Sequence, residues 1–236
     1  MGHLPSRVCG AAGGPCLWAG RPCAVAMAQM RLKVSREEFK LHYFGKVVID
    51  MAKSLEGLLS PCIAMQFASP TKITQVVPYR SRRYAERASP KVQSKFEELN
   101  FLLDGKPERQ IVEGRVWPIA QFAFDEPNTL IKCGMAFTTY PLKEGVTSHM
   151  WNGVYSNQVV SLLGREFGLL WHFSAVGAGP DGRPMGIVAG LYQCPEAALA
   201  VQPKIGRVLE RTGALELLSA LPYERTVGVG YTVRHP

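Results

Sequence analysis

The chain has 236 residues, 47% of them hydrophobic and 19% charged, and a formal net charge of +8 at neutral pH. This balance is typical of a folded protein with a substantial core and excludes wholesale disorder. Five of the eight positive charges precede Glu37, the first acidic residue, so the remaining 200 residues carry only +3. Binding to phosphates requires a concentrated basic surface, and the body of the chain is therefore not a generally basic nucleic-acid-binding protein.

Residues 1–29 are rich in glycine and alanine, contain arginines and lack any acidic residue. This composition is typical of mitochondrial or plastid transit segments, whereas Arg7 and Arg21 interrupt the apolar core that a secretory signal requires. We expect a transit-like or docking arm and a mitochondrial location, on the matrix side or peripheral to the inner membrane. No uncharged apolar run reaches the roughly 18 residues of a membrane-spanning helix.

Three of the six cysteines, Cys9, Cys16 and Cys23, lie seven residues apart. That spacing matches no common set of metal ligands, and the sequence contains no C-x-x-C pair. We expect free thiols, no metal and no cofactor, and the spacing leaves the role of these cysteines open.

The first structural unit is predicted over residues 30–119. A short strand at Met30–Val34 precedes a helix that begins at Ser35, where Glu38 completes a capping box, and ends near Gly57. The elements predicted after it are strands at Cys62–Ala68 and Lys72–Tyr79, a helix from Ser89 and Pro90 to Leu103, and a strand at Arg109–Trp117.

The second unit, over residues 120–236, repeats the order β-α-β-β-α-β. Its predicted elements are strands at Leu130–Tyr140, Leu169–Val176, Met185–Tyr192 and Arg225–Val233, with helices at Gly145–Leu163 and Pro195–Arg211. Single residues support the repeat, because a shift of 113 positions aligns Tyr79 with Tyr192, Pro90 with Pro203, Lys91 with Lys204 and Glu97 with Glu210. With three more residues inserted, Glu108-Arg109 aligns with Glu224-Arg225.

This order is that of the ferredoxin-like split βαβ unit, whose sheet has one face not covered by helices. Such apolar faces must be buried, and packing them against each other is the economical solution. We therefore predict an α+β protein in which two tandem ferredoxin-like β-α-β-β-α-β repeats pack sheet to sheet as an intramolecular α/β barrel.

The segment from Val76 to Ser81, followed by the arginine-rich run Arg82–Ala88, resembles the strand-into-helix segment of the NIPSNAP family, within the dimeric α/β-barrel superfamily. The similarity covers about residues 30–233 in outline. The family's usual tryptophan before the last tyrosine of the strand is replaced here by Pro78 and Leu191. The resemblance implies two tandem units and a mitochondrial location, and the wider superfamily also includes cofactor-independent monooxygenases and haem-degrading enzymes.

Two groups of residues are candidates for enzyme chemistry. His149, Trp151 and Asn152 are the residue types that the haem-degrading relatives use, but neighbouring helical positions point about 100° apart, so they do not address one ligand. Trp171 and His172 lie on a predicted strand and face opposite sides of the sheet. His172 is the one candidate for a ligand or base inside the barrel, and a hydrogen-bonded core histidine is the other interpretation.

One concentrated basic feature recurs every three or four residues and consists of Arg80, Arg83, Arg87, Lys91 and Lys95. Along one helix this basic stripe suits an acidic partner subunit, an anionic lipid headgroup or RNA phosphates. Pro90 is expected to break the helix and split the stripe in two.

The sequence contains no nucleophile elbow, P-loop, dinucleotide-binding or zinc-protease pattern. We therefore expect a non-catalytic accessory or structural subunit of a mitochondrial multiprotein assembly, most plausibly a respiratory-chain complex, with other subunits as partners. Two alternatives stay open: an α/β-barrel monooxygenase or haem-binding protein whose site lies between the two sheets, and a mitochondrial ribosomal or RNA-binding protein.

Overall fold

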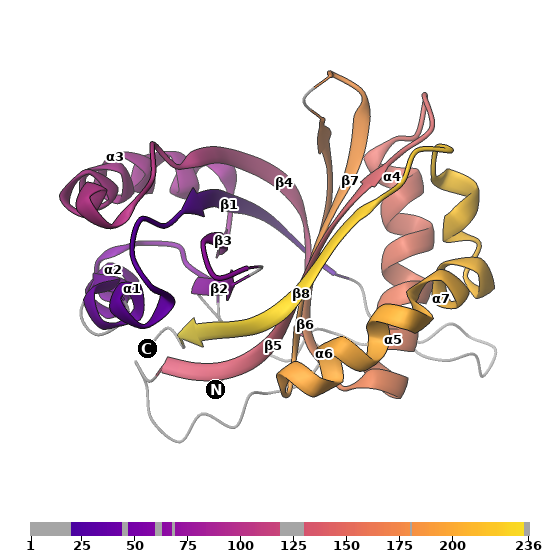
Figure 1. Cartoon of the computed structure of the whole chain (residues 1–236). Coiled ribbons are helices and arrows are strands. Elements are labelled where there is room, and N and C mark those ends of the chain that lie inside the picture. The colour runs from indigo at the N-terminus through magenta and orange to yellow at the C-terminus, as the bar shows by residue number, and fades with distance from the viewer. Residues whose placement is uncertain are drawn as a thin grey trace, which may run out of the picture.

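Eight antiparallel strands close into a barrel in the computed structural model, which describes residues 20–43, 47–59, 63–67, 69–118, 130–179 and 181–233 (Figure 1). The first half contains β1 (Arg21–Arg31), α1 (Arg36–His42), α2 (Val48–Ser54), β2 (Ile63–Phe67), β3 (Lys72–Tyr79), α3 (Arg82–Glu98), η2 (Asn100–Leu102) and β4 (Glu108–Pro118). The second half contains β5 (Leu130–Pro141), α4 (Ser148–Trp151), η3 (Asn152–Val159), α5 (Val160–Phe167), β6 (Leu169–Ala178), β7 (Pro184–Tyr192), α6 (Pro195–Val201), η4 (Gln202–Lys204), α7 (Ile205–Arg211), η5 (Ala214–Leu217) and β8 (Glu224–Val233). The prediction of an α+β chain built around an α/β barrel is confirmed.

The two halves of the barrel join edge to edge. The first half has the strand order β4-β1-β3-β2 and the second has β8-β5-β7-β6. Strand β2 pairs with β8, and β4 pairs with β6, so hydrogen bonds connect the halves at both seams. A single continuous sheet therefore encloses the interior, in place of two separate sheets stacked face to face.

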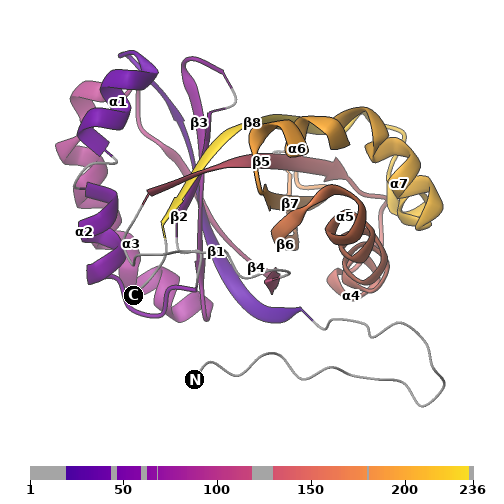
Figure 2. The same cartoon turned by 90° about the horizontal axis from the view of Figure 1, so that it is seen from below.

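Helices cover the outside of the barrel on two opposite sides, α1 to α3 on one side and α4 to α7 on the other (Figures 1 and 2). Because successive side chains of a strand point to opposite faces, every strand contributes both to the barrel interior and to a helix-covered layer. Three buried clusters result: one inside the barrel around Met135 and Phe173, and one beneath each group of helices. No helix in the described part of the chain is long and apolar enough to cross a membrane.

Strand β1 begins earlier than predicted. It spans Arg21–Arg31, so residues 21–29 belong to the barrel and not to an arm ending at residue 29. Both faces of β1 are buried, Val25 inside the barrel and Ala24 under the helices, so the sequence lacks the alternation that marks a half-exposed strand. Cys23 also faces the interior as a free thiol, whereas residues 1–19, with Cys9 and Cys16, lie outside the described residues.

Helix α3 also begins earlier than predicted, at Arg82, and Pro90 lies within it. Proline removes one backbone hydrogen bond, but Pro90 is exposed, so water can bond the carbonyl left free. The buried side of the helix, with Ala85, Val92 and Phe96, packs on the sheet and holds the helix together across the proline. The predicted break at Pro90 is therefore wrong, and Arg83, Arg87, Lys91 and Lys95 follow one continuous helix.

Candidate active site beneath the π-helix

Large polar and aromatic side chains meet on the outer face of the second half of the barrel. Arg225 on β8 lies opposite Thr138 on β5 and donates from Nη1 to the Thr138 hydroxyl at 3.1 Å. The same face of the sheet carries His172 on β6 and Tyr192 on β7. We call this region the second-half layer; it comprises Thr138, Tyr140, Trp151, Tyr155, His172, Ser174, Tyr192 and Arg225.

A π-helix covers this layer. The Thr147 hydroxyl caps the helix by accepting the Met150 N–H at 3.3 Å, and α4 then continues as the π-helix Asn152–Val159. Trp151 and Tyr155 stack with ring centroids 4.4 Å apart, and Trp151 Nε1 donates to the Ser174 hydroxyl at 2.8 Å. Single π-turns occur frequently at functional sites, and this one presses two aromatic rings onto the sheet.

Two glycines of β7 make room for these rings. A Cβ atom at Gly186 would lie 2.7 Å from Cζ2 of Trp151. A Cβ atom at Gly190 would lie 3.0 Å from Leu169 and 3.7 Å from Nδ1 of His172. The bare backbone of β7 therefore lets the Trp151 ring and the imidazole approach the sheet more closely than any larger residue would allow.

His172 faces the helices and not the barrel interior. Its neighbour Trp171 points inward instead, so of the two interpretations of His172 the structure excludes the one in which it lines the barrel interior. The imidazole is 1% exposed and lies between Tyr155 and Trp117, with centroid distances of 5.7 and 5.9 Å. Burial, assisted by the charge of Arg225, lowers the pKa of His172 to about 3, so the ring is neutral at physiological pH.

Several buried polar atoms of the layer lack a hydrogen bond of good geometry within the described residues. They are both ring nitrogens of His172, the hydroxyl of Tyr140, and Nε and Nη2 of Arg225. The Tyr140, Tyr155 and Tyr192 hydroxyls lie near the guanidinium and burial raises the pKa of all three, so they are neutral phenols. Tyr140 nevertheless has Tyr155 as a hydrogen-bonding neighbour, and Arg225 has Tyr192, so the imidazole of His172 is the group of the layer without a polar partner among the described residues. A buried polar group without a partner costs about 1–3 kcal/mol.

The equivalent residue of the first half, Arg109, has its partners. Its Nη1 donates to Gln93 Oε1 at 3.0 Å and its Nη2 to the Ser89 hydroxyl at 3.1 Å. Tyr43 likewise exchanges hydrogen bonds with Gln75. A shift of 113 residues places Gly206 at the position of Gln93 and Val188 at that of Gln75, so the second half lacks these two acceptors, whereas Gln202 stands at the position of Ser89.

The residues of the candidate site that sequence analysis missed are Arg225, Tyr140 and Tyr155. The signal that could have found Arg225 was already in the repeat, because Arg225 aligns with Arg109 while Gly206 replaces its acceptor Gln93. Of the candidates His149, Trp151 and Asn152, His149 is exposed and Trp151 is fully buried, so these two do not face one ligand, as predicted.

The basic stripe lies in the first half, away from this layer, where Arg82 pairs with Glu86 and Lys95 with Glu98. Its partner stays a prediction.

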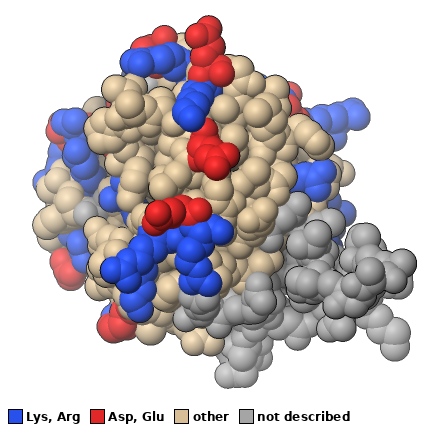
Figure 3. Space-filling model, turned by 90° about the vertical axis from the view of Figure 1, so that its right-hand side faces the viewer, with Lys and Arg blue, Asp and Glu red and all other residues tan. Residues whose placement is uncertain are grey.

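The layer is hidden beneath a surface of mixed charge. Figure 3 shows the face that the second-half helices present, on which basic and acidic side chains are interspersed among uncharged residues. Tyr223, which is 36% exposed, lies at the edge of the layer with its ring 5.2 Å from that of Tyr140.

The described residues do not fit a haem or a metal ion. No group of three histidine, cysteine or acidic side chains in the described part of the chain could hold a metal. A haem ligand needs open space at an imidazole nitrogen, yet His172 is enclosed by Tyr155, Trp117 and the backbone of Gly190. We therefore assign no role to a metal or a haem at this site.

No protein-family model and no curated protein sequence matches the chain. Solved structures do match its fold. A "putative monooxygenase" from Lactobacillus acidophilus NCFM has a TM-score of 0.54 at 12% identity, covering 92% of this chain and 95% of that one. A "putative monooxygenase" from Fusobacterium nucleatum has a TM-score of 0.57 at 13% identity, covering 92% and 94%. An "anthrone oxidase-like protein" has a TM-score of 0.54 at 12% identity, covering 89% and 91%.

At this level of identity the similarity shows the fold alone, which is the dimeric α/β barrel in a single chain. The expectation of a non-catalytic accessory subunit of a mitochondrial assembly is corrected, because the solved structures that share this barrel carry the names of enzymes. That expectation rested on the transit-like first residues and on a repeated fold without a known catalytic motif. A site built from residues far apart in the sequence leaves no such motif.

Proposed function

We propose that this protein is an α/β-barrel monooxygenase that oxidises a small hydroxyaromatic or ketoaromatic substrate in the second-half layer, without a bound cofactor. The observation that carries the proposal is the guanidinium of Arg225, which lies among neutral phenols, hydrogen-bonded to Tyr192, and near a buried neutral imidazole whose two nitrogens have no partner among the described residues. The names of the similar solved structures support the reaction class.

Arg225 supplies what an oxidisable aromatic anion needs. A guanidinium stays protonated at every physiological pH, and two donors on one side of it match the oxygen of an enolate or phenolate. In a layer closed off from water this attraction is stronger than at the surface. We expect Arg225 to hold the substrate oxygen and to stabilise the negative charge that forms when the substrate loses a proton.

His172 is suited to receive that proton. Its ring is neutral and its nitrogens are unpartnered, but Tyr155 and Trp117 enclose it, so the proposal requires these rings to move apart before a nitrogen can accept a proton from a substrate C–H or O–H group. The low pKa of His172 applies while no anion lies beside the ring. A substrate anion there would raise the pKa, because opposite charges favour the protonated imidazole. The aromatic walls formed by Trp151 and Tyr155 would stack on a planar substrate.

The reaction balances without an external reductant. The carbanion of the substrate gives its electrons to O₂, one oxygen atom becomes the new carbonyl, and the other leaves as water. Anthrone is the probe for this test, and one O₂ should be consumed for each anthraquinone and each water formed. We expect the purified protein to accelerate oxygen uptake and quinone formation; a rate equal to that of the buffer would reject the proposed function.

We also keep three earlier expectations as proposals: the tandem ferredoxin-like repeats, the resemblance to the NIPSNAP family and the mitochondrial location. The same strand order in both halves supports the tandem repeats. A fusion of residues 1–29 to a fluorescent protein tests the location, and diffuse cytosolic fluorescence would contradict it.

A further inference from the structure

A cavity of about 490 Å³ opens at the end of the barrel where β1 and β5 finish and β4 and β8 begin. It adjoins a second cavity of about 400 Å³. The residues that line both are Gln29, Glu108, Phe137, Thr139 and Glu224. This barrel mouth lies on the inner face of the sheet, whereas the second-half layer lies on its outer face.

Two carboxylates enter the barrel mouth from equivalent positions of the two halves. Glu108 on β4 pairs with Gln29 on β1, and Glu224 on β8 pairs with Thr139 on β5. Neither glutamate forms a salt bridge with a side chain of the described residues. The barrel mouth therefore presents two free negative charges, each beside a neutral polar side chain.

Among the described residues, the basic side chains around the barrel mouth form no ion pair with either glutamate. Arg109 lines the larger cavity, but its guanidinium is bonded to Ser89 and Gln93 under α3. Arg31, Lys72 and Lys106 line only the smaller cavity, where Asp104 also lies. The larger cavity is thus the more acidic of the two.

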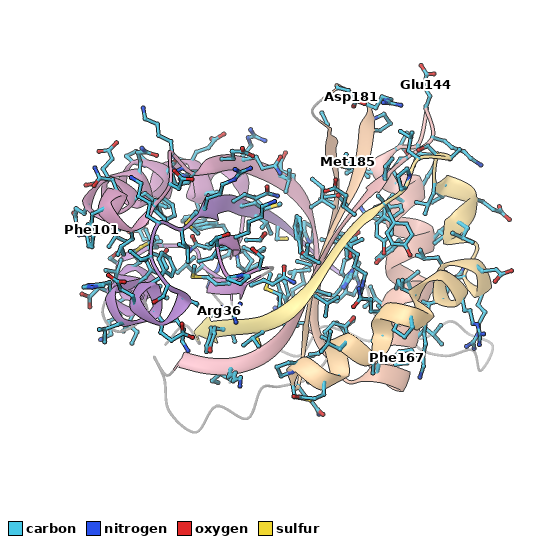
Figure 4. The ribbon with its side chains drawn as sticks, in the orientation of Figure 1. Arg36, Phe101, Glu144, Phe167, Asp181 and Met185 are labelled. Atoms are coloured by element: carbon cyan, nitrogen blue, oxygen red, sulfur yellow. The ribbon has the colours of Figure 1, made fainter. Side chains whose placement is uncertain are left out.

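Part of the wall of the larger cavity is apolar. It includes Met27, Phe137 and Ile187 from the barrel interior and Met185 at the start of β7 (Figure 4). An aromatic ring beside carboxylates is the usual environment for an organic cation, since the ring face attracts positive charge and thioethers adapt to an apolar body. A metal ion fits less well, because no third acidic, histidine or cysteine ligand joins the two glutamates among the described residues.

We propose that the barrel mouth binds a small organic cation, an ammonium group with an apolar body, between Glu108 and Glu224. The cation lies between the two carboxylates, and its hydrocarbon part extends toward Phe137, Met27 and Ile187. This site does not depend on the proposed oxidation, since Arg225 and His172 are on the other face of the sheet.

Calorimetric titration with 4-phenylbutylammonium tests the proposal, with 4-phenylbutanol and 4-phenylbutyrate as neutral and anionic matches of similar shape. We expect the cation to bind at least about tenfold more tightly than the alcohol, to weaken with added salt, and the butyrate to bind least. Each of Glu108→Gln and Glu224→Gln should weaken binding of the cation about fivefold, and the double variant should remove its preference over the alcohol.

Glu113→Gln is the matched control, because Glu113 is an exposed residue of β4 whose side chain points away from the barrel interior. It should bind the cation as the unchanged protein does. Equal affinity for cation and alcohol, or a double variant that binds as well as the unchanged protein, would overturn the proposal. Loss of anthrone oxidation would not bear on it, and binding of the ammonium to Arg225→Met would confirm that the two sites are separate.

Discussion

Arg109 and Arg225 occupy equivalent positions in the two halves, yet their hydrogen-bond partners differ. Ser89 and Gln93 bind the guanidinium of Arg109, so this arginine serves to attach α3 to the sheet. Arg225 has Thr138 as its geometric partner, and Nε and Nη2 are left without one. The two arginines thus have different surroundings in one fold, and the proposed function assigns the chemistry to the second half.

The largest expected effect comes from removing the available arginine. Arg225→Met should lower the rate of anthrone oxidation by about 100-fold or more, because it removes the charge that stabilises the substrate anion. Its thermal stability should change little or rise, since an unpaired buried charge disappears. Arg109→Met is the matched variant and should show the reverse, with near-normal rate and stability lower by about 1–3 kcal/mol. Equal loss of rate in both variants would contradict the assignment.

Giving Arg225 an acceptor should make the second half resemble the first. Gly206→Gln places an amide where Gln93 lies in the first half, and a Cβ at Gly206 meets no atom within 4 Å. We expect oxidation to slow about tenfold while stability rises. Gly206→Ala is the control, because it gains the same kind of helix propensity, about 1 kcal/mol, without an acceptor. If both variants slow oxidation alike, the effect belongs to the helix and not to Arg225.

The neutral imidazole of the second half should make stability depend on pH. The folded pKa of His172 is about 3 and the unfolded value is about 6.5, so the unfolded chain binds an extra proton between these values. Stability should therefore fall as pH is lowered through this window, by up to about 1.4 kcal/mol per pH unit. For His172→Phe, the free energy of unfolding measured in urea should depend less steeply on pH between these two pKa values. His149→Gln, at an exposed histidine, should retain the slope of the unchanged protein.

The smallest expected effect concerns the close packing of the π-helix. Gly186→Ala puts a Cβ 2.7 Å from the Trp151 ring and should destabilise the fold by about 1–3 kcal/mol. Gly153→Ala has no atom within 4 Å of the new Cβ and should be close to neutral. Thermal unfolding of the two variants compares them, and similar melting temperatures would show that Trp151 moves aside without cost.

The repeat explains why much of the barrel could be predicted from the sequence. Strand Lys72–Tyr79 was predicted at its observed bounds, and the other strands after the first lie within a few residues of their predictions. Alternating or continuous apolar runs bounded by turns identify such strands. The start of β1 was missed because both of its faces are buried, and the start of α3 because Ser89-Pro90 imitates the first turn of a helix.

The candidate site was beyond prediction for a different reason. Tyr140, Tyr155, His172 and Arg225 come from four separate elements, and their proximity depends on how strands β5 to β8 are ordered around the barrel. The alternation of apolar residues along a strand shows which residues share a face of the sheet. Which of the two faces lies inside the barrel is known only when the neighbouring strands are known. The same reasoning placed His172 on a strand correctly but could not choose between its two faces.

The covalent connection between the two halves has an evolutionary consequence. A barrel assembled from two identical chains carries every substitution twice, so losing the acceptor of one arginine would also free the other and weaken both helix layers. Here Gly206 and Gln93 are separate positions of one gene product, and selection acts on each alone. One half can preserve the stability of the whole while the other accumulates the unsatisfied groups that a new reaction requires.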